Sequence, residues 1–182
     1  MHDIERYLAR QLRHAGLDDL VPRVAPVLAR KAATRQGGFL YARTVVVAQI
    51  ARGIIDTDAQ GWEGQLATTT IGALEHDLSS GILVRDGVEL PDTARDLLRP
   101  LAWGLGRGLP GRDVWTTVAT ALSPHGVEYR AADLDWVLEN YGCHIVEDEQ
   151  DDETVYRLSH RTFVEHLVAS SPDVAGRAAG QA

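Results

Sequence analysis

The hydrophobic pattern at the start of the chain has the period of an α-helix. Apolar residues recur at intervals of three and four positions, at Ile4, Tyr7, Leu8 and Leu12. This spacing predicts a helix over residues 4–15, which Asp3 can cap and Gly16 can end. A second helix is expected to begin within residues 21–26, where prolines are tolerated in the first turn, and to reach the glycine pair at 37–38.

The next segment, residues 39–55, is apolar over most of its circumference. Its strongly polar residues are Arg43, Gln49 and Arg52. We therefore expect it to form the most buried helix of the first half of the chain. Together these three segments predict a small helical bundle over residues 1–60, followed by a polar connection that contains glycine.

A second domain is predicted over residues 61–171. Five helices are expected in it, and the apolar residues of the first four lie within 66–78, 97–103, 114–122 and 134–141. Residues 82–90, which contain an Asp-Gly pair, are expected to form either a tiny hairpin or an extended loop. The glycine-rich segment 104–111 is expected to separate two of the helices.

The apolar period changes from 3.6 to 2 after Gly142. Two strands, 143–147 and 154–158, flank the acidic turn 148–153 and predict a wing-like hairpin, and a last helix carries Phe163 and Leu167. Three helices, a two-stranded wing and a closing helix match the winged-helix arrangement. The predicted fold class is therefore mainly α, with a small helical bundle followed by a winged-helix domain with one β-hairpin.

Composition changes this picture little. The small, polar tail over residues 172–182 is predicted to be disordered. Cys143 is the single cysteine and cannot form an internal disulfide, and the sequence contains no apolar run long enough for a membrane span. We expect a cytoplasmic protein that makes no contact with a membrane.

Charge is distributed unevenly along the chain. Residues 1–55 carry nine Arg or Lys against four Asp or Glu, whereas residues 56–182 carry nine against 22. Such an asymmetry fits nucleic-acid contact at the basic end, and it equally fits two parts that pack on each other or on a partner.

The sequence contains no complete catalytic site. The only lysine, Lys31, lies outside any G-x-x-x-x-G-K-[ST] pattern, so no phosphate-binding loop is present. The glycines at 104, 106, 108 and 111 follow a helix instead of a strand, which argues against a dinucleotide fingerprint. We therefore expect no enzymatic activity from this chain alone.

Candidate nucleophile and metal sites are also weak. Cys143 and His144 are neighbours, and in a strand they would point to opposite faces. His160 and His166 lie six apart, on different sides of a helix, and the acidic runs near 147–153 lack the register of a calcium loop. No metal site is predicted.

Winged helices often bind DNA, but the charges oppose it here. The helix that would enter the groove carries Asp133, Asp135 and Glu139 against Arg130, and the hairpin tip is a run of carboxylates. Both elements would be repelled by phosphate. No nucleic-acid partner is expected.

Five segments carry a family resemblance. They are Asp3-Ile-Glu-Arg-Tyr7, Gly37-Gly-Phe-Leu-Tyr-Ala-Arg43, Arg95-Asp-Leu-Leu-Arg-Pro-Leu-Ala-Trp103 followed by Gly108-Leu-Pro110, Asp133-Leu-Asp-Trp-Val-Leu138, and Val155-Tyr-Arg-Leu-Ser-His-Arg-Thr-Phe-Val-Glu-His-Leu167. In this order they resemble the second half of the ATPase module of STAND proteins, which are signal-transducing ATPases of the AAA+ superfamily that include the NACHT branch. The resemblance covers about residues 3–170.

The resemblance implies a helical lid and a winged helix that close over ADP held by a P-loop core. It implies that His160 contacts the nucleotide phosphates, and that Gly38, Phe39 and Leu40 line the adenine pocket. Relatives with a Gly-Leu-Pro-Leu pattern use its proline, which this chain lacks.

The expected function is therefore regulatory. The chain would sense ADP or ATP, bound with Mg²⁺ only when a P-loop ATPase core is joined in cis or in trans, and relay that state to other protein domains. The alternatives are a free-standing protein-interaction (adaptor) module and a winged-helix DNA-binding regulator.

Overall fold

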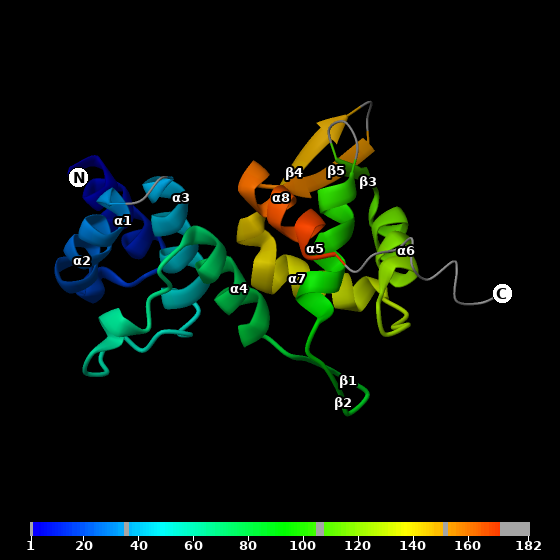
Figure 1. Cartoon of the computed structure of the whole chain (residues 1–182), viewed down its shortest axis with the longest axis horizontal. Helices are drawn as coiled ribbons and strands as arrows, with labels where there is room; N and C mark the ends of the chain where they lie inside the picture. The colour runs from blue at the N-terminus through cyan, green and yellow to red at the C-terminus, as the bar shows by residue number, and fades with distance from the viewer. Residues whose placement is uncertain (1, 35–36, 105–107, 151–152, 172–182) are drawn as a thin grey trace. The chain divides into compact units, whose positions relative to one another are not determined.

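The chain folds into two compact units, Met1–Ser80 and Gly81–Ala182, in a computed structural model that describes residues 2–34, 37–104, 108–150 and 153–171 (Figure 1). Helices make up 61% of it and two small sheets are present, so the prediction of a mainly helical chain is confirmed. The predicted tail over 172–182 lies outside the described residues. In the described part of the chain, no helix is both long enough and apolar enough to cross a membrane.

The domain boundary lies further along the chain than the sequence indicates. Residues 61–80 belong to the first unit, because Trp62, Leu66 and Ala73 are buried in its apolar core. The polar connection after residue 55 is therefore a loop within this unit. It contains the short 3₁₀ helix η3 (Trp62–Gly64) and leads to α4 (Thr70–Ser80).

The first unit begins with two helices that pack on each other. Helix α1 (His2–His14) buries the stripe of Ile4, Leu8 and Leu12. It ends at Gly16, whose φ of +73° is left-handed, and Leu17 N–H closes the turn on the Leu12 carbonyl at 2.9 Å. The short helix η1 (Asp18–Leu20) leads to α2 (Val21–Ala33), so the two predicted helices are present with shifted ends.

The predicted helix over 39–55 is shorter and changes type. Helix α3 (Gly38–Arg43) continues directly into a π-helical segment, η2 (Thr44–Ile50). Gln49, which the sequence marks as polar, is fully buried. Its Nε2 donates a hydrogen bond to the Ala73 carbonyl of α4 at 2.9 Å. This hydrogen bond satisfies the buried amide group of the side chain.

The second unit opens with a small hairpin, β1 (Leu83–Arg85) and β2 (Val88–Leu90). Asp86 and Gly87, at φ +54° and +79°, form the two-residue turn between them, which decides in favour of a hairpin over an extended loop. The predicted wing-like hairpin is present as well, because β4 (Ile145–Gln150) and β5 (Glu153–Leu158) pair in a separate sheet, so the second unit contains two hairpins where the fold class predicted one.

Four helices and a three-stranded antiparallel sheet make up the rest of the second unit (Figure 1). In chain order they are α5 (Thr93–Trp103), β3 (Leu109–Pro110), α6 (Arg112–Leu122), α7 (Ala131–Tyr141), β4 (Ile145–Gln150), β5 (Glu153–Leu158) and α8 (Arg161–Ala169), with the sheet order β3-β5-β4. Helix α5 packs against α6, α7 and α8 and forms the centre of this unit. Trp115 of α6 is fully buried and its Nε1 donates to the Leu97 carbonyl at 2.5 Å.

Strand β3 was not predicted. It lies in the glycine-rich segment, where Gly108 has a φ of +145° and a side-chain Cβ would come within 2.6 Å of the Tyr156 carbonyl oxygen. A glycine is needed here, because β3 approaches the backbone of β5 closely. Gly106, part of the same glycine series, lies outside the described residues.

The first strand of the second hairpin begins later than predicted. Cys143 and His144 lie in a short 3₁₀ turn, η4 (Gly142–His144), and β4 starts at Ile145. Cys143 and His144 therefore do not lie on opposite faces of a strand, as their positions in the sequence predict.

Candidate functional site

His160 occupies the corner where β5 ends and α8 begins. Its backbone is extended, its side chain is exposed, and its ring Nδ1 accepts a hydrogen bond from the Thr162 N–H at 3.1 Å. The imidazole therefore caps α8, as a Ser or Asp side chain would. An Nδ1 that accepts must be unprotonated, so the neutral ring carries its hydrogen on Nε2, which is left as a donor.

The His160 ring also packs against an aromatic side chain of α8. Phe163, which is buried, makes an edge contact with His160 at 6.1 Å between ring centroids, and a second with the buried His144 at 5.3 Å. The neighbouring Arg161 is exposed and forms an ion pair with Glu165 at 2.7 Å. The Arg161 guanidinium is thus already engaged, and the group that this corner offers an anion is the Nε2 donor of His160.

The segment Gly38–Leu40 forms the first turn of α3. Gly38 has no room for a side chain, because an added Cβ would overlap the backbone carbonyl oxygen of Ala32 in α2. Leu40 is half-buried, whereas Phe39 is 50% exposed and its ring packs edge-on against Tyr7 at 5.7 Å. Burial raises the pKa of the Tyr7 hydroxyl, and the positive charges of Arg43 and Arg10 oppose that shift.

The predicted nucleotide-contact residues fall into two groups. Gly38, Phe39 and Leu40 are brought together in the first unit, and His160 lies in the second. The exposed donor at His160 and the exposed ring of Phe39 are the features of each group that a ligand could use.

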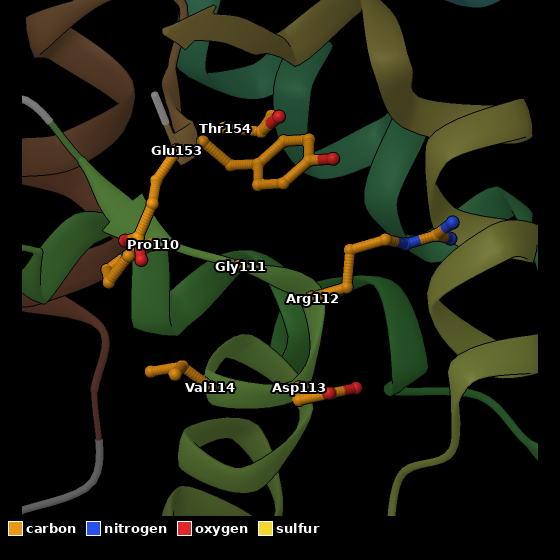
Figure 2. Close-up of a pocket in the computed structure, with 8 residues that line it drawn as sticks. Pro110, Gly111, Arg112, Asp113, Val114, Glu153 and Thr154 are labelled. Carbon is orange, nitrogen blue, oxygen red and sulfur yellow. The ribbon is translucent and has the colours of Figure 1, made fainter. Parts of the chain in front are cut away.

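A surface hollow of about 500 Å³ lies beside the second hairpin (Figure 2). Its lining consists of Pro110, Gly111, Arg112, Asp113, Val114, Glu153, Thr154 and Tyr156. The Arg112 side chain points away from Glu153 and pairs with Asp135 of α7. The hollow thus offers two carboxylates and one guanidinium already engaged, which is a poor arrangement for binding phosphate.

The electrostatics of α7 differ from the sequence interpretation. Asp133 is 2% exposed: its Oδ2 accepts from the Arg130 N–H at 2.8 Å and from Arg85 Nη1 at 2.5 Å. It caps α7 and fixes β1 to that helix, so it cannot repel a ligand in the way its position in the sequence suggests. Asp135 and Glu139 remain exposed on α7, and the surface stays acidic.

A buried polar network at α5 was missed in the sequence. Asp96, which is 2% exposed, accepts from Arg99 Nη1 at 2.9 Å, from the Tyr129 hydroxyl at 2.8 Å and from Ser123 Oγ at 3.3 Å. Burial, together with the hydrogen bond to the Asp96 carboxylate, raises the pKa of Tyr129 well above its ordinary value. The available signal was an Asp three positions before an Arg on an otherwise apolar helix face.

The comparisons with known proteins provide no relative from which a residue role can be transferred. No protein-family model matches the chain, and no curated protein or solved structure matches it either.

Proposed function

We propose that this chain is the regulatory lid and winged-helix part of a STAND-type signalling ATPase. In this role it reads ADP or ATP held by a P-loop core and relays the nucleotide state to partner domains, with no catalysis of its own. The observation that carries the proposal is the exposed imidazole of His160, held at the start of α8 with Nε2 left as a donor.

The topology of the second unit supports the winged-helix part of the proposal. Its elements follow the order helix, strand, helix, helix, two strands and helix from α5 to α8. Strand β3 pairs with β5, the second strand of the hairpin, which gives the sheet order β3-β5-β4. This order supports a winged helix, in which α7 would take the position of the recognition helix.

His160 suits a phosphate because of the hydrogen that its tautomer leaves on Nε2. A hydrogen bond from this N–H to a phosphate oxygen has one charged partner and contributes about 1.5–3 kcal/mol. The amino-terminal end of α8 adds a partial positive charge in the same region. Nucleotides with different phosphate numbers would present different oxygens to this donor.

The first unit would supply the base-binding part of the lid. The exposed ring of Phe39 offers an aromatic surface, and Gly38 allows α3 to start in close contact with α2. Mg²⁺ and the phosphates would be held by the P-loop core, in cis or in trans, since this chain has no phosphate-binding loop.

The proposal is tested by ADP retention in an ATPase that joins this chain to a P-loop core. His160→Ala should speed ADP dissociation about tenfold, the equivalent of about 1.4 kcal/mol, and raise basal signalling. His14→Ala, which alters an exposed histidine at the end of α1, is the matched control and should change neither. Unchanged ADP release in His160→Ala would remove the sensing role.

Catalysis by the chain alone is tested separately. The full chain mixed with ATP and Mg²⁺ should release phosphate at the rate of a buffer blank. Phosphate release above that background, once contaminating ATPases are excluded, would show that the chain is an enzyme in its own right.

A protein-interaction module is the second candidate, favoured by the exposed apolar residues near β1 and β2. Ile82, Val84 and Val88 are 48%, 60% and 59% exposed, and exposed apolar surface often marks protein contacts. Affinity capture with the full chain separates the two functions: a regulatory lid predicts a P-loop ATPase core as the main partner, whereas an adaptor predicts other proteins. Salt-sensitive retention on duplex DNA would instead favour a DNA-binding regulator.

A further inference from the structure

A second cavity, distinct from the His160 corner, lies between the first hairpin and the start of α5. Its volume is about 340 Å³, which is within the range of sites for small molecules. Apolar groups of Leu90, Pro91 and Val127 form much of its wall, together with the buried Tyr129. Such a wall suits the hydrocarbon body of a ligand.

The polar groups of this cavity are mainly carboxylates. Asp96 lies in its lining and is almost fully buried, and Asp92 and Glu89 are exposed members of the same lining. The Asp96 charge is balanced by Arg99, with which it pairs at 2.9 Å. Asp92 Oδ2 lies 3.6 Å from Nε2 of His125, an exposed side chain that forms an ion pair only when it is protonated. No ion pair involving Glu89 is present in the described part of the chain.

The buried carboxylate of Asp96 is held in one orientation by hydrogen bonds. Asp96 accepts hydrogen bonds from Tyr129 and Ser123 in addition to Arg99, so its carboxylate cannot rotate away from the cavity without breaking them. A preorganised carboxylate beside an apolar wall loses little free energy of ordering when a ligand binds. Asp92 and Glu89 remain free to approach a positive group.

We propose that this cavity binds a small organic cation, with a primary ammonium group among the carboxylates of Asp92, Glu89 and Asp96 and an apolar body against Leu90, Pro91 and Val127. An anion would be repelled by the exposed carboxylates of Asp92 and Glu89. A hard metal ion would need six or more oxygen ligands, which this largely apolar wall does not offer. The inference is independent of the proposed nucleotide-sensing role, which uses other residues.

The test is a titration of the full chain with 2-phenylethylamine, followed by ¹H–¹⁵N correlation spectra at neutral pH. Saturable shifts are expected at residues 89–96 and 125–129, with a dissociation constant on the order of 1 mM for so small a ligand. Phenylacetate and 2-phenylethanol carry the same phenyl ring with a negative and a neutral head group. They should bind at least ten times more weakly.

Variants of exposed residues locate the site without endangering the fold. Asp92→Asn and Glu89→Gln should each weaken binding of 2-phenylethylamine up to about fivefold, as expected for exposed ion pairs, and the double variant should weaken it further. Glu139→Gln removes an exposed carboxylate of α7 outside the cavity lining and should leave the affinity unchanged. Equal binding of phenylacetate, shifts that do not involve residues 89–96, or no saturation at tens of millimolar would each overturn the proposal.

Discussion

His160 combines two roles that single-residue variants can separate. Its Nδ1 caps α8 by accepting from the Thr162 N–H at 3.1 Å, and its Nε2 is the donor proposed to meet a phosphate. The first role belongs to stability and needs only an acceptor atom close to the backbone. The second role depends on the reach of the imidazole ring.

The two roles of His160 predict different effects of Ala and Asn. His160→Ala should lower the free energy of unfolding by about 1 kcal/mol, because the α8 cap is lost, whereas His160→Asn should retain most of it because asparagine caps well. In an ATPase joined to a P-loop core, both variants should lose ADP with similar speed. Urea unfolding and ADP dissociation are the two measurements. Normal ADP retention in His160→Asn would mean that the cap alone matters.

Tyr129 donates to a buried carboxylate, and its removal should be costly. Tyr129→Phe leaves Asp96 with one partner fewer, so we expect the free energy of unfolding to fall by about 1.5–3 kcal/mol, as for other hydrogen bonds to charged groups. Urea denaturation followed by circular dichroism measures the change. Tyr7→Phe is the control: Tyr7 is half-buried, so this change should lower the free energy of unfolding by less than Tyr129→Phe does.

The same hydroxyl predicts a pH dependence at the alkaline end. Burial and the Asp96 carboxylate raise the pKa of Tyr129 in the folded state above the ordinary value of 10.0. The unfolded chain therefore loses this proton first, so the stabilisation is complete below pH 10.0 and is lost as pH rises toward the folded pKa. From about pH 10 to 12, wild type should lose more stability than Tyr129→Phe. Parallel losses in the two proteins would contradict this assignment.

At the scale of helices and strands, close backbone contacts require glycine at two positions. Gly38 begins α3 against the Ala32 carbonyl oxygen of α2, and Gly108 brings β3 against the Tyr156 carbonyl oxygen of β5. In both places a side chain would meet backbone atoms, which cannot rotate aside as the end of a side chain can. Each glycine therefore determines how closely two elements approach.

Substitution of Gly38 tests this account of the packing between α2 and α3. Gly38→Ala should destabilise the protein by about 1–3 kcal/mol, because the new methyl group must displace the α2 backbone. Gly64→Ala is the matched control in the same unit, since an added Cβ there meets no atom within 4 Å and the backbone has no positive φ. Thermal unfolding of the two variants compares them. Equal stability of Gly38→Ala and wild type would show that α2 and α3 are not held this closely.

The elements that sequence could predict are those with a regular apolar repeat. Helices α1, α2, α6 and α8 repeat their apolar residues every three or four positions, so their existence follows from local pattern. Strand β3 has two residues and is defined by pairing with β5, some 45 positions later, which no local pattern records.

Polar residues that become buried were the other source of error. The sequence marks Gln49 as polar within a buried helix, places Asp133 on a helix that would face DNA and singles out nothing at Asp96, yet each is at most 2% exposed. One partner of each, Ala73, Tyr129 or Arg85, lies 24 to 48 residues away in the sequence. A buried polar group requires a partner, and these distant partners cannot be identified from neighbouring positions. His160 was placed by resemblance, and its capping bond was not foreseen.

At the scale of the whole molecule, the position of the boundary between the two units determines which fragments should fold. A fragment of residues 1–80 retains Trp62, Leu66 and Ala73, which complete the apolar core of the first unit, whereas residues 1–60 lack all three. Full burial of one large apolar side chain contributes about 1.5–3 kcal/mol, a large part of the stability of so small a unit. Residues 1–80 should therefore unfold cooperatively in urea by circular dichroism, and residues 1–60 should show a weak, gradual transition. Cooperative unfolding of the shorter fragment would return the boundary to the polar connection, and α4 would then belong to the second unit.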